Sequence, residues 1–227
     1  MAEIYLIGTI HEDGEGSEKL ERLLGELKPQ IVLAEGATSV IQLRERFLGF
    51  LEDELVARRA DTKLKAAILK YERNQHFEGL VSKRYATAHQ IEFDFFNDRK
   101  FDASRQKARF VARDNAKYLL EQGIKGFREF YLQQNLAVQK RWDSLKAVVD
   151  TEEEREEAER IVNNREAAEN DFFRDAIMES VLRNRVAANG AKRIVTVTGA
   201  AHILDDPKDR NFYGKIRDLQ PKRKFLY

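Results

Sequence analysis

Residues 4–11 read IYLIGTIH, a short apolar run that leads into a Gly-x-x-His motif. The pattern returns at residues 194–202, which read IVTVTGAAH. With 12 Gly and 4 His in 227 residues, chance placement gives about 0.2 such motifs in the chain. Each apolar run predicts a buried strand. His11 and His202 are therefore expected just past the carboxyl ends of two strands, where open α/β sheets bind ligands.

The segment that follows the first motif predicts a strand, helix, strand unit. Ser17 can cap a helix to about Leu27, and Pro29 prevents its continuation. Residues 31–35 then read as a second buried strand. Two strands joined by a helix pair in parallel, so we expect Glu35 to emerge at the same sheet edge as His11.

The rest of the chain is mostly helical in pattern. Residues 39–89 show helical periodicity with breaks expected at 73–77 and at Gly79, and residues 91–96 read as a third strand. The final residues, 221–227, read as an edge strand whose basic residues deter edge pairing. We find neither internal repeats nor a low-complexity linker.

A long helical segment is expected at about 104–189, interrupted at Gly123 and Gly126. Thr151 and Glu154 fit a capping box that restarts the helix. A helix from there to Ala188 would be about 55 Å long, so we expect a break near residues 163–164. The sequence thus predicts one α/β domain over 1–227, with a small mixed, largely parallel central sheet, extensive helical covering and this helical insertion.

Composition narrows the class of protein. The hydrophobic content of 42% supports a substantial core, and 40 Lys and Arg nearly balance 39 Asp and Glu. This balance gives no global field that would favour nucleic acid or an anionic membrane as partner. Without cysteine, disulfides, thiolate metal sites and a cysteine nucleophile are excluded. With no leader or membrane span in the pattern, we expect a cytoplasmic protein.

Two imidazoles and one carboxylate are predicted at one sheet edge, since His11, Glu35 and His202 all follow strands. Such a set holds the divalent ion in several hydrolytic sites. A metal with an open position lowers the pKa of its bound water and polarises a carbonyl. We therefore expect a divalent metal, either Mn, Co or Zn, held by these three residues. Alternatively, the histidines are loop residues or buried hydrogen-bonding groups, and Glu35 is a favourable charge at a helix start.

Arg174 lies on a helical face with apolar residues, so its guanidinium needs an anion. That anion is a structural carboxylate, Glu35 or a substrate oxyanion, and snorkelling to solvent is the further possibility. Glu12 is a weaker candidate for a proton acceptor. By default, Asp98 and Arg99 form a surface ion pair, and His76 and His89 are structural.

Several motifs together resemble a known superfamily. GTIH at residues 8–11, Lys28-Pro29 before the second strand, Asp98-Arg99, Arg174-Asp175 and GAAH at residues 199–202 are similar to the TraB/PrgY and Tiki proteins, in order along the chain. The resemblance implies an α/β fold and, from the Tiki branch, metal-dependent peptidase chemistry. It implies that His11, Glu35 and His202 are ligands or catalytic groups and that Arg174 supports them.

The chain also departs from that superfamily. Many TraB-type proteins carry carboxyl-terminal membrane segments and Tiki proteins are exported and anchored, whereas neither feature is expected here. After His11 the chain has Glu12, where the family usually has a hydroxyl-bearing residue. More distant relatives with paired Gly-x-x-His motifs are the erythromycin-esterase-like enzymes, in which histidine is a general base, and a haem-binding lipoprotein group.

Three hypotheses follow for function. The first is a metal-dependent hydrolase, peptidase-like, acting on a small peptide or another amide or ester. The second is a metal-free, esterase-like hydrolase with histidine as general base, oriented by Glu35. The third is a non-catalytic module that binds a peptide or cofactor, of the signalling-shutdown type. A homodimer through the long helices is possible in all three, and nucleic acid and membrane partners are not expected.

Overall fold

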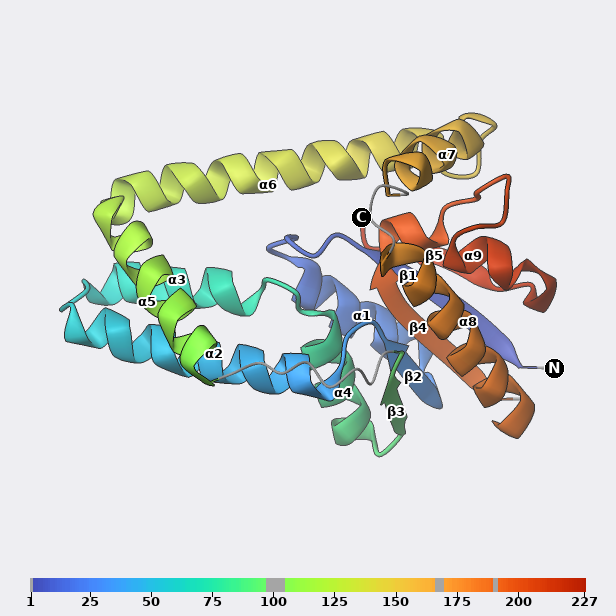
Figure 1. Ribbon diagram of the computed structural model, residues 1–227, viewed down its shortest axis with the longest axis horizontal. Coiled ribbons are helices and arrows are strands. Elements are labelled where there is room, and N and C mark those ends of the chain that lie inside the picture. Colours follow the sequence, from blue (N-terminus) through green and yellow to red (C-terminus); the bar gives the residue numbers. More distant parts are fainter. Residues whose placement is uncertain (1, 97–104, 166–169, 190–191) are drawn as a thin grey trace.

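The central element of the computed structural model is a parallel β-sheet (Figure 1). The structure describes residues 2–96, 105–165, 170–189 and 192–227. Within them the sheet has five strands in the order β3-β2-β4-β1-β5. The strands are β1 (Glu3–Thr9), β2 (Ile31–Ala34), β3 (Glu92–Phe95), β4 (Arg193–Gly199) and β5 (Lys222–Phe225).

Each of the four strand pairs in this sheet is parallel. Helices separate successive strands, so each connection is a crossover rather than a hairpin. The predicted α/β class with helical covering is confirmed, while the described strands contain none of the antiparallel pairing that a mixed sheet would have. The register pairs Thr9 with Gly199 and Ala34 with Val197. The ends of β1, β2 and β4 therefore reach one edge together.

Helices fill most of the remaining chain. They are α1 (Gly16–Leu27), α2 (Thr38–Ala57), α3 (Thr62–Arg73), α4 (Glu78–His89), α5 (Arg105–Glu121), α6 (Gly123–Val148), α7 (Glu153–Arg165), α8 (Asn170–Asn189) and α9 (Phe212–Lys215), with the 3-10 helices η1 (Ala200–Ile203) and η2 (Arg217–Leu219). In the described residues, every helix is too short or too polar for a bilayer span.

Several predicted helix boundaries differ from the observed ones. The break at 73–77 is confirmed, but Gly79 lies inside α4 and an unpredicted break separates α2 from α3. Gly123 begins α6 with a φ of 63°, a conformation that glycine adopts without strain, whereas Gly126 lies inside the helix. The break expected near 163–164 is wrong, because these two residues lie inside α7, which extends to Arg165.

The two predicted helix caps, at Ser17 and at Thr151, are both wrong. α1 begins at Gly16 rather than after Ser17, and no side chain caps it. Thr151 does not form the expected capping box, because its hydroxyl donates to the carbonyl oxygen of Val148. The carboxylate of Glu154 instead accepts from the backbone N–H groups of Asp150 and Asp205, so Glu154 ties α7 to the loop after η1.

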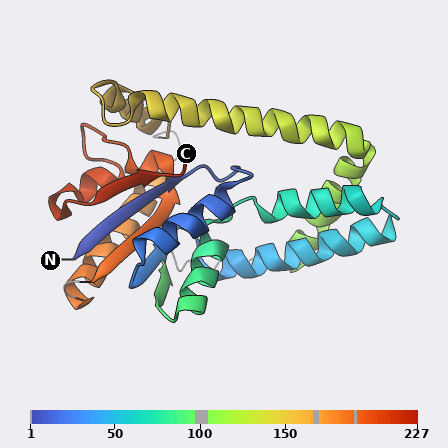
Figure 2. The same ribbon diagram turned by 180° about the vertical axis from the view of Figure 1, so that it is seen from behind.

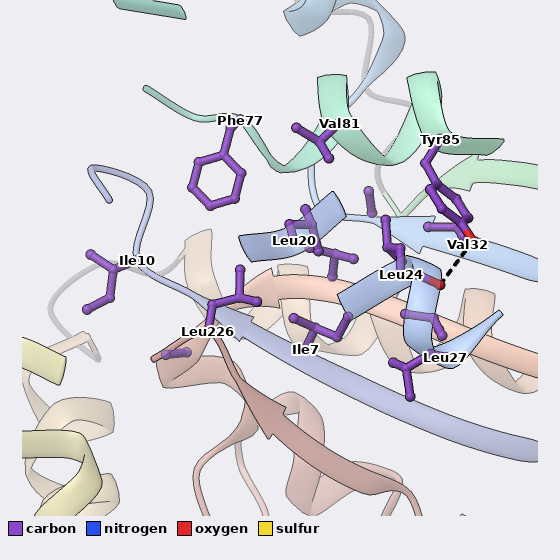
Figure 3. Packing of buried hydrophobic residues seen from close by; sticks show 14 of the residues in the cluster. Ile7, Ile10, Leu20, Leu24, Leu27, Val32, Phe77, Val81, Tyr85 and Leu226 are labelled. Carbon is purple, nitrogen blue, oxygen red and sulfur yellow. Dashed lines mark hydrogen bonds between the residues drawn. The ribbon is translucent and has the colours of Figure 1, made fainter. Parts of the chain in front are cut away.

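Alternate strand residues supply the two faces of the sheet, as the pleat requires. Ile7 and Val32 face a cluster with α1, α4 and the end of α6 (Figure 3). Leu6 and Leu33 face the opposite cluster, with α8 and α9. Every one of these four strand residues is fully buried, so the strands read as continuous apolar runs in the sequence.

A helical arm extends away from the sheet (Figures 1 and 2). α2, α3, α5 and the start of α6 share a separate apolar core that includes Leu51, Leu55, Ile68 and Phe127. α6 then runs back from the tip of the arm to the sheet (Figure 2). The arm therefore combines part of the predicted 104–189 insertion with α2 and α3, which lie outside it.

Candidate functional site

The strand ends bring the sequence-predicted residues to one place. His11 lies two residues beyond β1, Glu35 directly follows β2, and His202 lies in η1, which directly follows β4. Glu35 continues the β2–β4 pairing by donating its backbone N–H to the carbonyl oxygen of Val197 over 2.8 Å. Local strand and turn geometry thus positions all three side chains.

Gly199 marks the point at which these side chains converge. A Cβ on Gly199 would stand 3.5 Å from His11 Nε2, 3.5 Å from His202 Cδ2 and 3.7 Å from Glu35 Oε2. Two histidines separated by 191 positions in the sequence numbering therefore face a common point next to one carboxylate.

His11 is held by a buried carboxylate that comes from α4. Its Nδ1 lies 2.6 Å from Oε1 of Glu78, to which the hydroxyl of Thr9 also donates over 2.7 Å. Because an ionised carboxylate only accepts hydrogen bonds, Nδ1 carries the proton and Nε2 of the neutral ring has a free lone pair. The His11 side chain is 35% exposed and Glu78 only 4%. Nε2 of His11 therefore belongs to an oriented and partly exposed ring.

The His11–Glu78 pair shifts the pKa of both groups. Burial lowers the pKa of His11, but the hydrogen bond and charge of Glu78, together with the charge of Glu12, outweigh it and raise that pKa above 6.5. Burial raises the pKa of Glu78, but the hydrogen bonds from His11 and Thr9 lower it overall. Glu78 therefore stays ionised at neutral pH and keeps the ring oriented.

His202 has an equivalent partner but a different environment. Its Nδ1 lies 2.6 Å from Oδ1 of Asp175 on α8, and both side chains are almost completely buried. Its Nε2 lies 3.9 Å from Oε1 of Glu35. The second imidazole is thus oriented like the first but enclosed by protein.

Glu35 is engaged at both oxygens. Oε1 forms an ion pair with Arg174. Oε2 accepts hydrogen bonds from the hydroxyl of Thr198 over 2.8 Å and from the backbone N–H of Gly199 over 2.9 Å. Of the anions considered for Arg174, Glu35 is thus one that it contacts. Burial lowers the pKa of Arg174, against the charge of Asp175.

The arrangement of His11, Glu35 and His202 gives no support to the predicted metal site. Across the described ranges, no three His, Asp or Glu side chains are grouped as ligands. Glu35 already satisfies Arg174, Thr198 and Gly199. A guanidinium at that carboxylate also repels a divalent cation. Glu35 is therefore held by an ion pair and two hydrogen bonds at the strand ends.

A cavity of about 510 Å³ opens beside these groups, which is within the usual size of small-molecule sites. The strand ends and η1 supply Thr9, His11 and residues 199–201, while α6 and α7 supply the opposite wall. Glu12 also lines the cavity, where Arg141 on α6 donates to it over 3.1 Å. Glu12, the predicted proton acceptor, therefore forms an ion pair with Arg141.

The remaining residues singled out in the sequence are His76, His89 and the pair Asp98-Arg99. His76 donates its backbone N–H to the carbonyl oxygen of His11 over 3.0 Å, and the two rings lie 5.3 Å apart. Sequence reasoning assigned it no place near the site. His89 instead packs on Tyr85, with ring centroids 4.2 Å apart. Asp98 and Arg99 lie outside the described residues.

Glu78 and Asp175 are the site residues that sequence reasoning missed. Glu78 is the first residue of α4 and lies 67 residues from His11 in the sequence. The sequence pattern of this helix gives no sign that Glu78 faces the sheet. Asp175 follows Arg174, and the resemblance to the superfamily includes it without giving it a role. A search for carboxylates that could orient each histidine would have included both among many candidates.

Comparisons with known protein families, curated proteins and solved structures gave no match to the chain.

Proposed function

We propose that the protein is a metal-independent hydrolase of ester or amide bonds, with His11 as the general base. The supporting observation is the 2.6 Å contact between His11 Nδ1 and Glu78, which orients Nε2 at the wall of the cavity. A carboxylate, an imidazole and an open position for water are the groups that general-base catalysis needs. The Arg174–Glu35 pair beside the site favours this mechanism over a metal ion.

The proposed reaction begins with water held by Nε2 of His11. As the water oxygen bonds to the carbonyl carbon, its proton moves to Nε2, and the electron pair of the C=O bond moves onto oxygen. Glu78 accepts the Nδ1 proton's hydrogen bond throughout and stabilises the imidazolium. When the tetrahedral intermediate collapses, the proton passes from His11 to the leaving alcohol or amine, which departs with the electron pair of the broken bond.

Arg174 is the proposed stabiliser of the oxyanion. It is the cation held against Glu35 at the strand ends, and its charge acts on His11 closely enough to oppose that residue's raised pKa. A fixed cation near developing negative charge stabilises a transition state without reorganisation. His202, enclosed with Asp175, is a positioning residue that packs beside Glu35.

Metal-dependent hydrolysis and simple ligand binding are the alternatives, and one experiment separates all three. The chain is purified, treated with EDTA and assayed on p-nitrophenyl esters and peptide amides, with and without added Mn²⁺, Co²⁺ or Zn²⁺. We expect chelation to leave turnover unchanged and H11Q to lower it about 10²- to 10⁴-fold. The matched control, H89Q, removes an exposed imidazole that is not part of the cavity lining and should keep full activity.

Other outcomes identify the alternatives. Activity that is lost with EDTA and restored by a metal would contradict the proposed mechanism in favour of the metal-dependent one. Tight binding of a peptide or ester without turnover would favour a binding module. Equal activity in H11Q and H89Q would show that His11 is not the base.

A further inference from the structure

The wall of the cavity formed by α6 and α7 carries an excess of positive charge. Lys140 and Arg141 on α6 and Arg160 on α7 all line it, against two carboxylates, Glu12 and Glu157. This wall lies opposite the strand ends that carry the proposed catalytic groups. A substrate bound for hydrolysis at His11 would therefore extend towards these cations.

Two of the three cations are already neutralised. Arg141 donates to Glu12 over 3.1 Å. Arg160 makes two hydrogen bonds to Glu157, over 2.6 and 2.7 Å. By contrast, the ammonium of Lys140 has no ion-pair or hydrogen-bond partner within the described part of the chain. The cavity thus offers one uncompensated positive charge on its wall.

The cavity is also lined by apolar residues. Ile10, Leu145, Ile161, Ala200 and Ala201 line the cavity together with the charged residues. An aliphatic chain can pack on such a surface, and it releases water as it does so. The cavity therefore combines an apolar lining with one cation, Lys140, whose charge is not paired by the described residues.

We propose that the substrate is an ester or amide whose aliphatic acyl group ends in a carboxylate, and that Lys140 binds this carboxylate. This inference rests on the proposed function for the identity of the reacting bond. One uncompensated cation matches a monoanion better than a phosphate dianion. Lys140 is then a specificity-determining residue that acts on substrate binding and not on the chemical step.

The test uses two esters of equal acyl length, mono-p-nitrophenyl adipate and p-nitrophenyl hexanoate. We expect the wild type to favour the adipate ester in kcat/KM by about fivefold, as for a partly exposed ion pair. K140Q should remove this preference through KM, leaving hexanoate hydrolysis within about twofold, and K140R should retain it. The matched control is K125Q, which removes a charge from the same helix outside the cavity lining.

Three results would overturn the inference: no wild-type preference for the adipate ester, a preference that persists in K140Q, or an equal loss in K125Q. If neither ester is hydrolysed, the proposed function fails separately. Calorimetry with N-butyl adipamic acid and N-butylhexanamide then decides the inference. Tighter binding of the acid that is lost in K140Q supports it, and equal binding contradicts it.

Discussion

The two Gly-x-x-His motifs have the same spacing and the same position after a strand, yet they have different surroundings. His11 lines the cavity and is 35% exposed in its side chain, whereas the His202 side chain is 3% exposed. Each ring has its Nδ1 fixed by a buried carboxylate at 2.6 Å. A repeated motif has thus produced one accessible imidazole and one enclosed imidazole, which suit catalysis and positioning respectively.

The glycines of the two motifs differ in the same way. A Cβ on Gly8 would lie 2.8 Å from Ile203 Cδ1 and 3.0 Å from the backbone of Ala200, so close packing excludes a side chain there. A Cβ on Gly199 would meet its neighbours at 3.5 Å or more, an ordinary contact, but those neighbours are the site groups. The first glycine allows the sheet to pack against η1, and the second keeps space open in the site.

The largest expected effect is a difference in activity between the two histidines. H11Q removes the proposed base, so kcat/KM on an activated ester should fall about 10²- to 10⁴-fold, while the urea midpoint changes little. H202Q should reduce activity less but destabilise the fold by about 1–3 kcal/mol, because Asp175 loses its partner in a buried position. Steady-state kinetics and urea unfolding on the same preparations measure both. A smaller activity loss in H11Q than in H202Q would reverse the assigned roles.

The next largest effect is a difference in stability between the G8A and G199A variants. G8A should cost about 1–3 kcal/mol, because overpacking shifts η1 away from the strand end. G199A should change the free energy of unfolding by less than about 0.5 kcal/mol, yet lower kcat/KM, since its methyl group occupies the point between His11 and Glu35. Denaturant unfolding and ester hydrolysis test this contrast. If G199A unfolds as easily as G8A, the second glycine is structural as well.

The sequence predicted the part of the site that depends on local rules. Apolar runs, a crossover helix and parallel pairing were enough to place His11, Glu35 and His202 at one edge. Glu78 and Asp175 were beyond these rules, because they belong to α4 and α8, and only tertiary packing decides which helix residues face the sheet. The same reason explains the helical arm, in which α2 packs against α5 across a long sequence separation.

The smallest expected effect is on the pH dependence of activity, which should distinguish Glu78 from Asp175. Glu78 raises the pKa of His11 above 6.5, and the base form of His11 exists only above its pKa, so the acidic limb of the activity profile should lie above pH 6.5. E78Q removes the charge and should move that limb to lower pH. D175N should leave the limb in place, since Asp175 contacts His202 instead. The measurement is kcat/KM from pH 5 to 9.

The stability of the fold should also depend on pH, because the pKa of His11 changes on folding. Because the pKa of His11 is raised on folding, the protonated ring stabilises the native state fully below its unfolded pKa of about 6.5, and this contribution disappears as pH rises through the folded pKa. Wild-type urea midpoints should therefore decline from pH 6 to 8, and those of E78Q should decline less. A D175N profile that flattens as much as that of E78Q would show that the enclosed histidine, not the accessible one, titrates in this range.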